Sequence, residues 1–183
     1  MNILLNILIF LIFMIKDIDL SKTNRKNNAE LKRIIGGHKS WISSLTILPN
    51  GNLVSGSADV SIKIWNPNNG SLIQTLSGHA NTVTSLAVLP NGSLASGSWD
   101  QTIKIWNPNN GTLIRSIRGH TDHVLSLAVL QNGYLASGSA DYTIKIWNPE
   151  DGSLIQTLSG HTGSVNCVAV LPDGNLASGS YDN

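Results

Sequence analysis

The stretch LASGSWDQTIKIWNPNNGTLIRSIRGH, residues 94–120, decides the fold because the chain repeats it. The same pattern reads LVSGSADVSIKIWNPNNGSLIQTLSGH 41 residues earlier and LASGSADYTIKIWNPEDGSLIQTLSGH 41 residues later. The Gly-His pair that closes each copy keeps this spacing, at residues 37–38, 78–79, 119–120 and 160–161. A constant period of this length, with several short strand-like runs per unit, is typical of propellers and solenoids.

Each full unit contains four strand-like runs. In the second unit they are residues 83–89, 93–98, 102–107 and 112–117. Turn signals separate them, and the Asn-Gly and Asp-Gly pairs among these are strong hairpin signals because both residues tolerate positive φ. No stretch of the repeats has helical periodicity. The sequence therefore predicts an all-β fold of four-stranded antiparallel meanders.

The first run of each unit predicts how the units pack. The four runs ISSLTIL, VTSLAVL, VLSLAVL and VNCVAVL are almost continuously apolar, which indicates strands covered on both faces. A single meander cannot bury both of its faces, so neighbouring units must stack. Cys167, the single cysteine, takes the position of Ser44, Ser85 and Ser126 in this alignment, and we expect a small buried thiol there. One cysteine excludes an intrachain disulfide.

Charge argues against a nucleic-acid partner. The formal net charge of the 183 residues is +1. Residues 1–33 carry six Lys/Arg and three Asp/Glu, so +3, and the rest carries six and eight, so −2. A slightly acidic repeat region lacks the clustered positive charge that nucleic-acid binding needs. The repeats also have no phosphate-cradling loop and no His-x-x-x-His pair, so we expect neither cofactor nor metal.

Residues 1–30 read as an apolar leader followed by a polar linker. The run MNILLNILIFLIFMI, residues 1–15, spans about 22 Å as a helix, short of the roughly 30 Å hydrocarbon core of a bilayer. Three interpretations stay open: a signal or anchor, an apolar segment that docks on a protein, or an artefact of gene-start prediction. We expect a cytoplasmic protein. Membrane contact, or a secretory route, follows only if residues 1–15 act as an anchor or signal.

The repeat region spans residues 31–183, and it begins and ends inside a unit. Its repeats cover approximately residues 31–76, 77–117, 118–158 and, in part, 159–183. Residues 31–35 align with an outermost strand, and the last unit stops before the strand that would carry the next Trp. We therefore expect an incomplete propeller, a fragment of a longer one. Self-association through open blade edges is the alternative.

Three conserved patterns within the units, Gly-His, Ser-Gly-Ser-x-Asp and Ile-Lys-Ile-Trp, resemble the WD-repeat family of β-propellers over residues 31–183. The resemblance implies that each unit holds a structural tetrad of buried polar side chains. The implied sets are His38, Ser55, Asp59 and Trp65; His79, Ser96, Asp100 and Trp106; His120, Ser137, Asp141 and Trp147; and, incomplete, His161, Ser178 and Asp182. The chain departs from the name-giving Trp-Asp pair, since Asn follows each of these tryptophans.

A serine, a histidine and an aspartate in one set also suggest a hydrolase. A catalytic triad, however, needs one exposed nucleophile beside an oxyanion hole. This set recurs at identical spacing in every unit, which favours a structural role. We therefore expect no catalytic residues and no enzyme activity.

Function is expected where the units differ. The residue before the turn aspartate is Ala58, Trp99, Ala140 or Tyr181, and the residue three after the Gly-His histidine is Trp41, Thr82, His123 or Ser164. The family resemblance places both positions on a face that such propellers use for partners, and single large aromatics suit binding anchors. Trp41, Trp99, His123 and Tyr181 are therefore the candidate partner-binding residues. Covering of neighbouring loops, or neutral drift after duplication, remains the alternative for these side chains.

Two functions follow from the resemblance and the absence of a unique catalytic set. The first is a non-catalytic protein–protein interaction scaffold, with proteins or peptides docking on the turn-rich face. The alternative is a regulatory or sensor part of a larger enzyme or membrane-anchored receptor.

Overall fold

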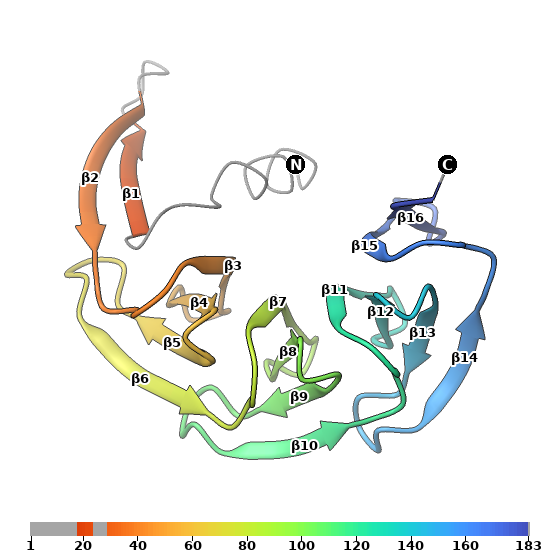
Figure 1. Ribbon diagram of the computed structural model, residues 1–183. Helices are drawn as coiled ribbons and strands as arrows, with labels where there is room; N and C mark the ends of the chain where they lie inside the picture. Colours follow the sequence, from red (N-terminus) through yellow and green to blue (C-terminus); the bar gives the residue numbers. More distant parts are fainter. Residues whose placement is uncertain (1–17, 24–28, 183) are drawn as a thin grey trace.

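The computed structural model describes residues 18–23 and 29–182, and every regular element within them is a β-strand (Figure 1). The predicted leader, residues 1–15, lies outside the described residues.

Three four-stranded antiparallel sheets, here called blades, follow one another along the chain. The first blade comprises β3 (Ile42–Ile47), β4 (Leu53–Ser57), β5 (Ser61–Trp65) and β6 (Leu72–Ser77). The second comprises β7 (Val83–Val88), β8 (Leu94–Ser98), β9 (Ile103–Trp106) and β10 (Leu113–Ile117). The third comprises β11 (Val124–Val129), β12 (Leu135–Ser139), β13 (Ile144–Trp147) and β14 (Leu154–Leu158).

The blades stand side by side along an open arc (Figure 1). The first strand of each blade lies on the inside of the arc, and the fourth lies on the outside. Adjacent inner strands contact one another, β3 with β7, β7 with β11 and β11 with β15. The expected all-β architecture of stacked meanders is confirmed, and the arc does not close over the described residues.

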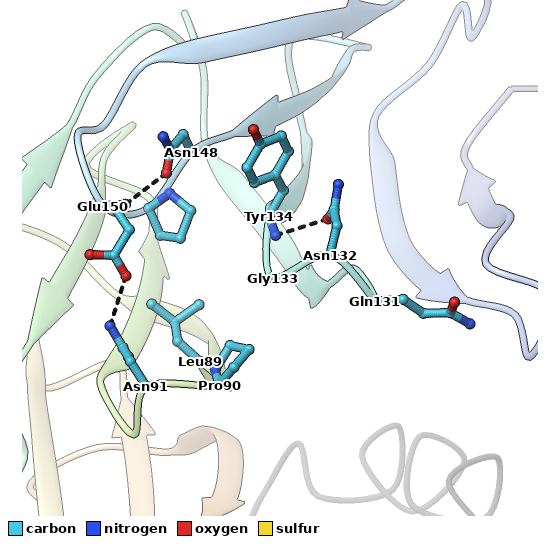
Figure 2. A pocket seen from close by; sticks show the side chains of 10 residues that line it. Leu89, Pro90, Asn91, Gln131, Asn132, Gly133, Tyr134, Asn148 and Glu150 are labelled. Atoms are coloured by element: carbon cyan, nitrogen blue, oxygen red, sulfur yellow. Dashed lines mark hydrogen bonds between the residues drawn. The ribbon is translucent and has the colours of Figure 1, made fainter.

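The tight turns between the first and second strands follow from their Asn-Gly pairs. In the third blade the Gly133 nitrogen donates to the Leu130 carbonyl over 2.9 Å. Gly133 itself has φ of +85°, a conformation that favours glycine. The Asn132 side-chain oxygen accepts from the Tyr134 nitrogen at 3.0 Å, as Figure 2 shows. An Asx turn and a glycine thus reverse the chain without help from outside the unit.

The hydrophobic core lies between blades. One cluster joins Ile62, Ile64 and Leu76 of the first blade to Val83 and Trp106 of the second. A second cluster joins the second blade to the third in the same way. Each blade therefore covers the face of its neighbour, as the continuous apolar inner strands predicted.

The predicted polar linker is wrong for residues 18–23 and 29–30, which form strands. β1 (Ile18–Thr23) pairs antiparallel with β2 (Ala29–Ile35), so residues 18–23 and 29–30 are strand. The sequence Ile-Asp-Leu-Ser of residues 18–21 alternates apolar and polar residues with the two-residue period of a strand. Ile35 packs with Ile42 and Trp65, so β2 covers the first blade as an outer strand would.

The last unit forms a two-stranded sheet of β15 (Val165–Val170) and β16 (Leu176–Ser180). Here the expected buried thiol is wrong, because Cys167 is exposed. The equivalent serines each accept a hydrogen bond from the next inner strand, for example Ser126 from the Val168 nitrogen at 3.1 Å. No further inner strand lies against β15 in the described part of the chain, so nothing covers Cys167.

Candidate functional site

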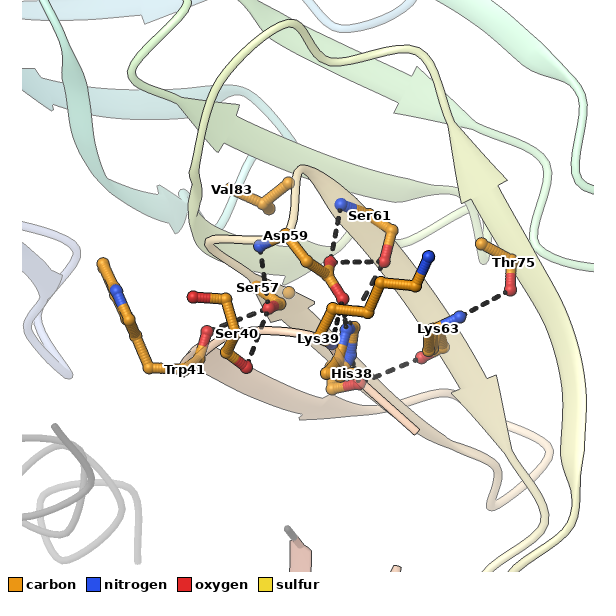
Figure 3. Close-up of polar contacts among 12 residues, drawn as sticks. His38, Lys39, Ser40, Trp41, Ser57, Asp59, Ser61, Lys63, Thr75 and Val83 are labelled. Atoms are coloured by element: carbon orange, nitrogen blue, oxygen red, sulfur yellow. Dashed lines mark hydrogen bonds and ion pairs between the residues drawn. The ribbon is translucent and has the colours of Figure 1, made fainter. Parts of the chain in front are cut away.

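A chain of hydrogen bonds links four side chains in each complete unit, and Figure 3 shows His38 and Asp59 of the first unit. In the first unit, Trp65 Nε1 donates to Ser55 Oγ at 2.8 Å. Ser55 Oγ lies 2.6 Å from His38 Nε2, and His38 Nδ1 lies 2.8 Å from Asp59 Oδ2. Because the indole can only donate and the carboxylate accepts, the protons run in one direction: indole to hydroxyl, hydroxyl to Nε2, Nδ1 to carboxylate. This arrangement needs a neutral histidine.

The other units repeat this geometry. In both the second and the third unit, the indole-to-Oγ distance is 2.8 Å and the Oγ-to-Nε2 distance is 2.7 Å. The distance from Nδ1 to the carboxylate is 2.8 Å in the second unit and 2.7 Å in the third. In the last unit His161 lies 2.6 Å from Asp182 and 2.8 Å from Ser178. The His161 side chain is 28% exposed, against 1% for His38. The last set is therefore open to water.

The charge states of the first and third sets follow from their surroundings. Burial lowers the pKa of His38 and of His120 below 6.5 and outweighs the attraction of their aspartates. Burial alone would raise the pKa of Asp59, but hydrogen bonds from Ser61, the Lys39 nitrogen and His38 lower it to about 2. The result is a neutral ring beside an ionised carboxylate.

In the first three sets this geometry buries the serine hydroxyl. Ser55, Ser96 and Ser137 are fully buried, and each hydroxyl oxygen accepts from an indole. A hydroxyl in this position cannot reach a substrate. Each set hydrogen-bonds the turn at the aspartate to the loop that leads into the blade.

The turn aspartate brings the two variable positions of each unit together. Asp100 Oδ2 accepts from His79 and from the Ala80 nitrogen, while its Oδ1 accepts from Thr102. Beside this clamp, the Trp99 nitrogen donates to the Thr82 carbonyl at 3.0 Å. The same bond joins residue 58 to Trp41, residue 140 to His123 and Tyr181 to residue 164, at 3.0, 2.9 and 3.0 Å. We call this end of the blades the turn face.

Three of the four candidate partner-binding residues form one aromatic row across the turn face. The rings of Trp41 and Trp99 meet edge to face, with centroids 6.2 Å apart. Trp99 in turn stacks on His123 at 5.1 Å, with an angle of 16° between the planes. These residues come from the first, second and third blades, and Trp41 and Trp99 are half-buried. We call Trp41, Trp99 and His123 the aromatic row.

Tyr181, the fourth candidate, is 80% exposed, and within the described residues no ring contact joins it to the aromatic row. At the other end of the row, His123 Nε2 lies 3.8 Å from Asp122 Oδ1. Both of these side chains are exposed by more than 40%.

Sequence reasoning missed a cavity at the opposite ends of the strands, between the second and third blades (Figure 2). Its lining includes Gln131, Tyr134 and Glu150. All three differ from their counterparts in the other units, so the comparison that singled out Trp99 could also have found them.

The described residues, 18–23 and 29–182, contain no group of three or more His, Cys, Asp or Glu side chains that could hold a metal ion. They also contain no helix long and apolar enough to cross a bilayer.

The fold and the repeated hydrogen-bonded sets define a β-propeller whose blades are built from one recurring unit. The family model for the WD domain, G-beta repeat, matches residues 29–66, 70–107, 111–148 and 152–183. The chain belongs to the WD-repeat family.

Among solved structures, the chain is similar to the crystal structure of the WD40 β-propeller domain of Doa1, with a TM-score of 0.77 and 30% identity. The match covers 82% of this chain and 51% of that chain, so this chain spans about half the length of the structure it matches. A comparison with curated protein sequences finds no match.

Proposed function

We propose that this chain is a non-catalytic scaffold whose partner proteins or peptides dock on the turn face at the aromatic row. WD40 propeller domains generally mediate protein–protein interactions. The observation that supports docking at the aromatic row is the contact between three unit-specific rings from three successive blades. Trp41 contacts Trp99, and Trp99 contacts His123. Because these rings come from separate units and contact one another, they form one continuous surface. Side chains that only covered their own loops would not be in contact.

The composition of this surface supports a protein partner. Indole and imidazole rings offer a large apolar area at a small cost in side-chain entropy, and tryptophan is enriched among residues that dominate interface energies. The neighbouring Asp122 and His123 provide polar atoms at the rim. Tyr181 extends the same end of the blades as a separate, exposed ring.

Peptide selection on the immobilised full chain tests the proposal. Peptides from a random library are selected, and their affinities are measured for the parent chain and for Trp99→Ala. Because Ala58 and Ala140 take this position in the first and third blades, the variant keeps a side chain that the turn already accepts. We expect affinity to fall roughly tenfold or more, as for an interface anchor.

Thr112→Ser is the matched control, since Thr112 follows the β9–β10 turn at the other end of the blades, does not line the cavity there, and has Ser71 and Ser153 as counterparts. We expect it to leave the affinity of these peptides unchanged. Selected peptides that bind Trp99→Ala and Trp41→Ser as tightly as the parent chain would refute docking at the aromatic row.

A further inference from the structure

A cavity of about 350 Å³ opens between the second and third blades, at the strand ends opposite the turn face (Figure 2). Its apolar walls come from Leu89, Pro90 and Pro149. Tyr134 contributes an aromatic ring and Glu150 a carboxylate, and Figure 2 shows these two side chains on different sides of the space. The volume lies at the lower end of the range for ligand pockets.

The residues that make this cavity distinctive are unit-specific. Gln131, Tyr134 and Glu150 occupy positions where the second unit has Pro90, Ser93 and Asn109. The first unit has Pro49, Asn52 and Asn68 at the same positions. The corresponding junction between the first and second blades therefore has neither a ring nor a carboxylate. Three departures from a nearly invariant repeat meet at one cavity.

The loop that carries Glu150 is held through its backbone. The backbone nitrogen of Glu150 donates to Asn148 Oδ1 at 3.0 Å, and the backbone carbonyl of Glu150 accepts from Arg115 Nη2 at 2.8 Å. Arg115 thus binds the main chain of Glu150, and no ion pair between the two side chains occurs among the described residues.

The Glu150 side chain is exposed, and its carboxylate has one protein partner. Glu150 Oε1 accepts from Asn91 Nδ2 at 3.0 Å, a contact between the second and third blades. Its Oε2 has no hydrogen-bond partner within the described part of the chain. The cavity therefore presents a charged acceptor, fixed on one side, next to an aromatic ring and apolar walls.

We propose that this cavity binds an arginine side chain of a partner peptide. The guanidinium would lie against the face of Tyr134 and donate to Glu150, and its methylene stem would contact Leu89, Pro90 and Pro149. A planar guanidinium stacks on aromatic rings and donates to carboxylates at the same time, which a lysine ammonium does less well. The excess of acidic side chains in residues 34–183, eight against six, complements a cationic ligand.

The site is independent of the aromatic row, because the two lie at opposite ends of the blades. The test is a nuclear magnetic resonance titration of the full chain with the blocked peptide Gly-Gly-Arg-Gly-Gly. Its counterpart with citrulline in place of arginine keeps the shape of the side chain and removes the charge. We expect the arginine peptide to shift the amide signals of Gly133, Tyr134 and Glu150 saturably, and the citrulline peptide to shift them at least about fivefold less.

Three variants complete the titration. Glu150→Gln removes the charge at constant shape, and Tyr134→Ser installs the counterpart residue of the second unit; each should raise the Kd roughly tenfold. Asp173→Asn removes one negative charge outside the cavity lining, installs the residue that the other units have at this turn, and should leave the Kd unchanged. Equal shifts from the two peptides, an unchanged Kd in Glu150→Gln, or shifts confined to the turn face would overturn the proposal.

Discussion

At the residue scale, the repeated polar set in each unit contributes stability by satisfying groups that the blade buries. Ser96 is the central member of the second set, because it accepts from Trp106 and donates to His79. The register of these sets was predictable from sequence, since a side chain repeated at constant spacing must occupy one place in every blade. The stacking of Trp99 on His123 was not, because it depends on the distance and angle between blades.

Removing the central hydroxyl should destabilise the fold. Ser96→Ala leaves the buried Trp106 Nε1 and His79 Nε2 without partners, and we expect the free energy of unfolding to fall by about 1–3 kcal/mol in urea denaturation. Ser178→Ala is the matched control, because His161 is partly exposed and water can replace the hydroxyl. Equal losses in the two variants would contradict this role of the set.

Acid should weaken the fold in two stages. The pKa of His38 and His120 is lowered by burial in the folded state, so below pH 6.5 the unfolded chain takes up protons first and the free energy of unfolding decreases. Asp59 and Asp141 have folded pKa values of about 2 against 3.8, so a further loss follows as the pH falls from 3.8 toward 2. Urea midpoints measured from pH 7.5 to 2.5 check both stages. A urea midpoint that is higher at pH 5.5 than at pH 7.5 would refute the first stage.

Val60 occupies a strained position directly after the first turn aspartate. Its φ is +63°, in the left-handed region that β-branched residues avoid. Val60→Asn should therefore raise the free energy of unfolding by about 1 kcal/mol and the melting temperature by roughly 2–4 °C. Gln101→Asn at the equivalent turn should give a smaller gain, because glutamine is not branched at Cβ. The Val60 side chain is exposed, so little packing is lost in the variant. A lower melting temperature for Val60→Asn would contradict this prediction.

At the element scale, the second strand of each blade must fit closely beneath the inner strand of the next blade. A Cβ placed on Gly97 of β8 would lie 2.8 Å from Val124 Cγ1 of β11. In β16, which has the same sequence, a Cβ on Gly179 would meet only Cys167 Cβ at 3.9 Å. The strands themselves were predictable from their turn residues, whereas β1 was missed because it lies outside the repeat and has no counterpart to compare.

This fit predicts different outcomes for one substitution at two places. Gly97→Ala should destabilise the fold by about 1–3 kcal/mol through overpacking against Val124. Gly179→Ala should be neutral or slightly stabilising, because alanine loses less backbone entropy in a strand. Thermal unfolding of the two variants measures the difference, and combining Gly97→Ala with Val124→Ala should cost less than the sum of the single changes. Equal tolerance of the two alanines would contradict close packing between blades.

At the scale of the whole molecule, each blade depends on its neighbour. The sequence LASGS is completely buried in β8 and β12 but mostly exposed in β16, where no further strand covers it within the described residues. Sequence predicted that units must stack, but identical sequences cannot reveal which copies are covered. The arc also separates two surfaces that differ from the repeat, the aromatic row at one end of the blades and the Tyr134 and Glu150 cavity at the other.

Repeated residues hold the blades together, and we propose that unit-specific residues bind partners. The affinity of a selected peptide for Trp99→Ala, measured beside the melting temperature of the same variant, tests this division directly. We expect a roughly tenfold or larger loss of affinity with a melting temperature within about 2 °C of the parent chain. An unchanged affinity at an unchanged melting temperature would contradict it.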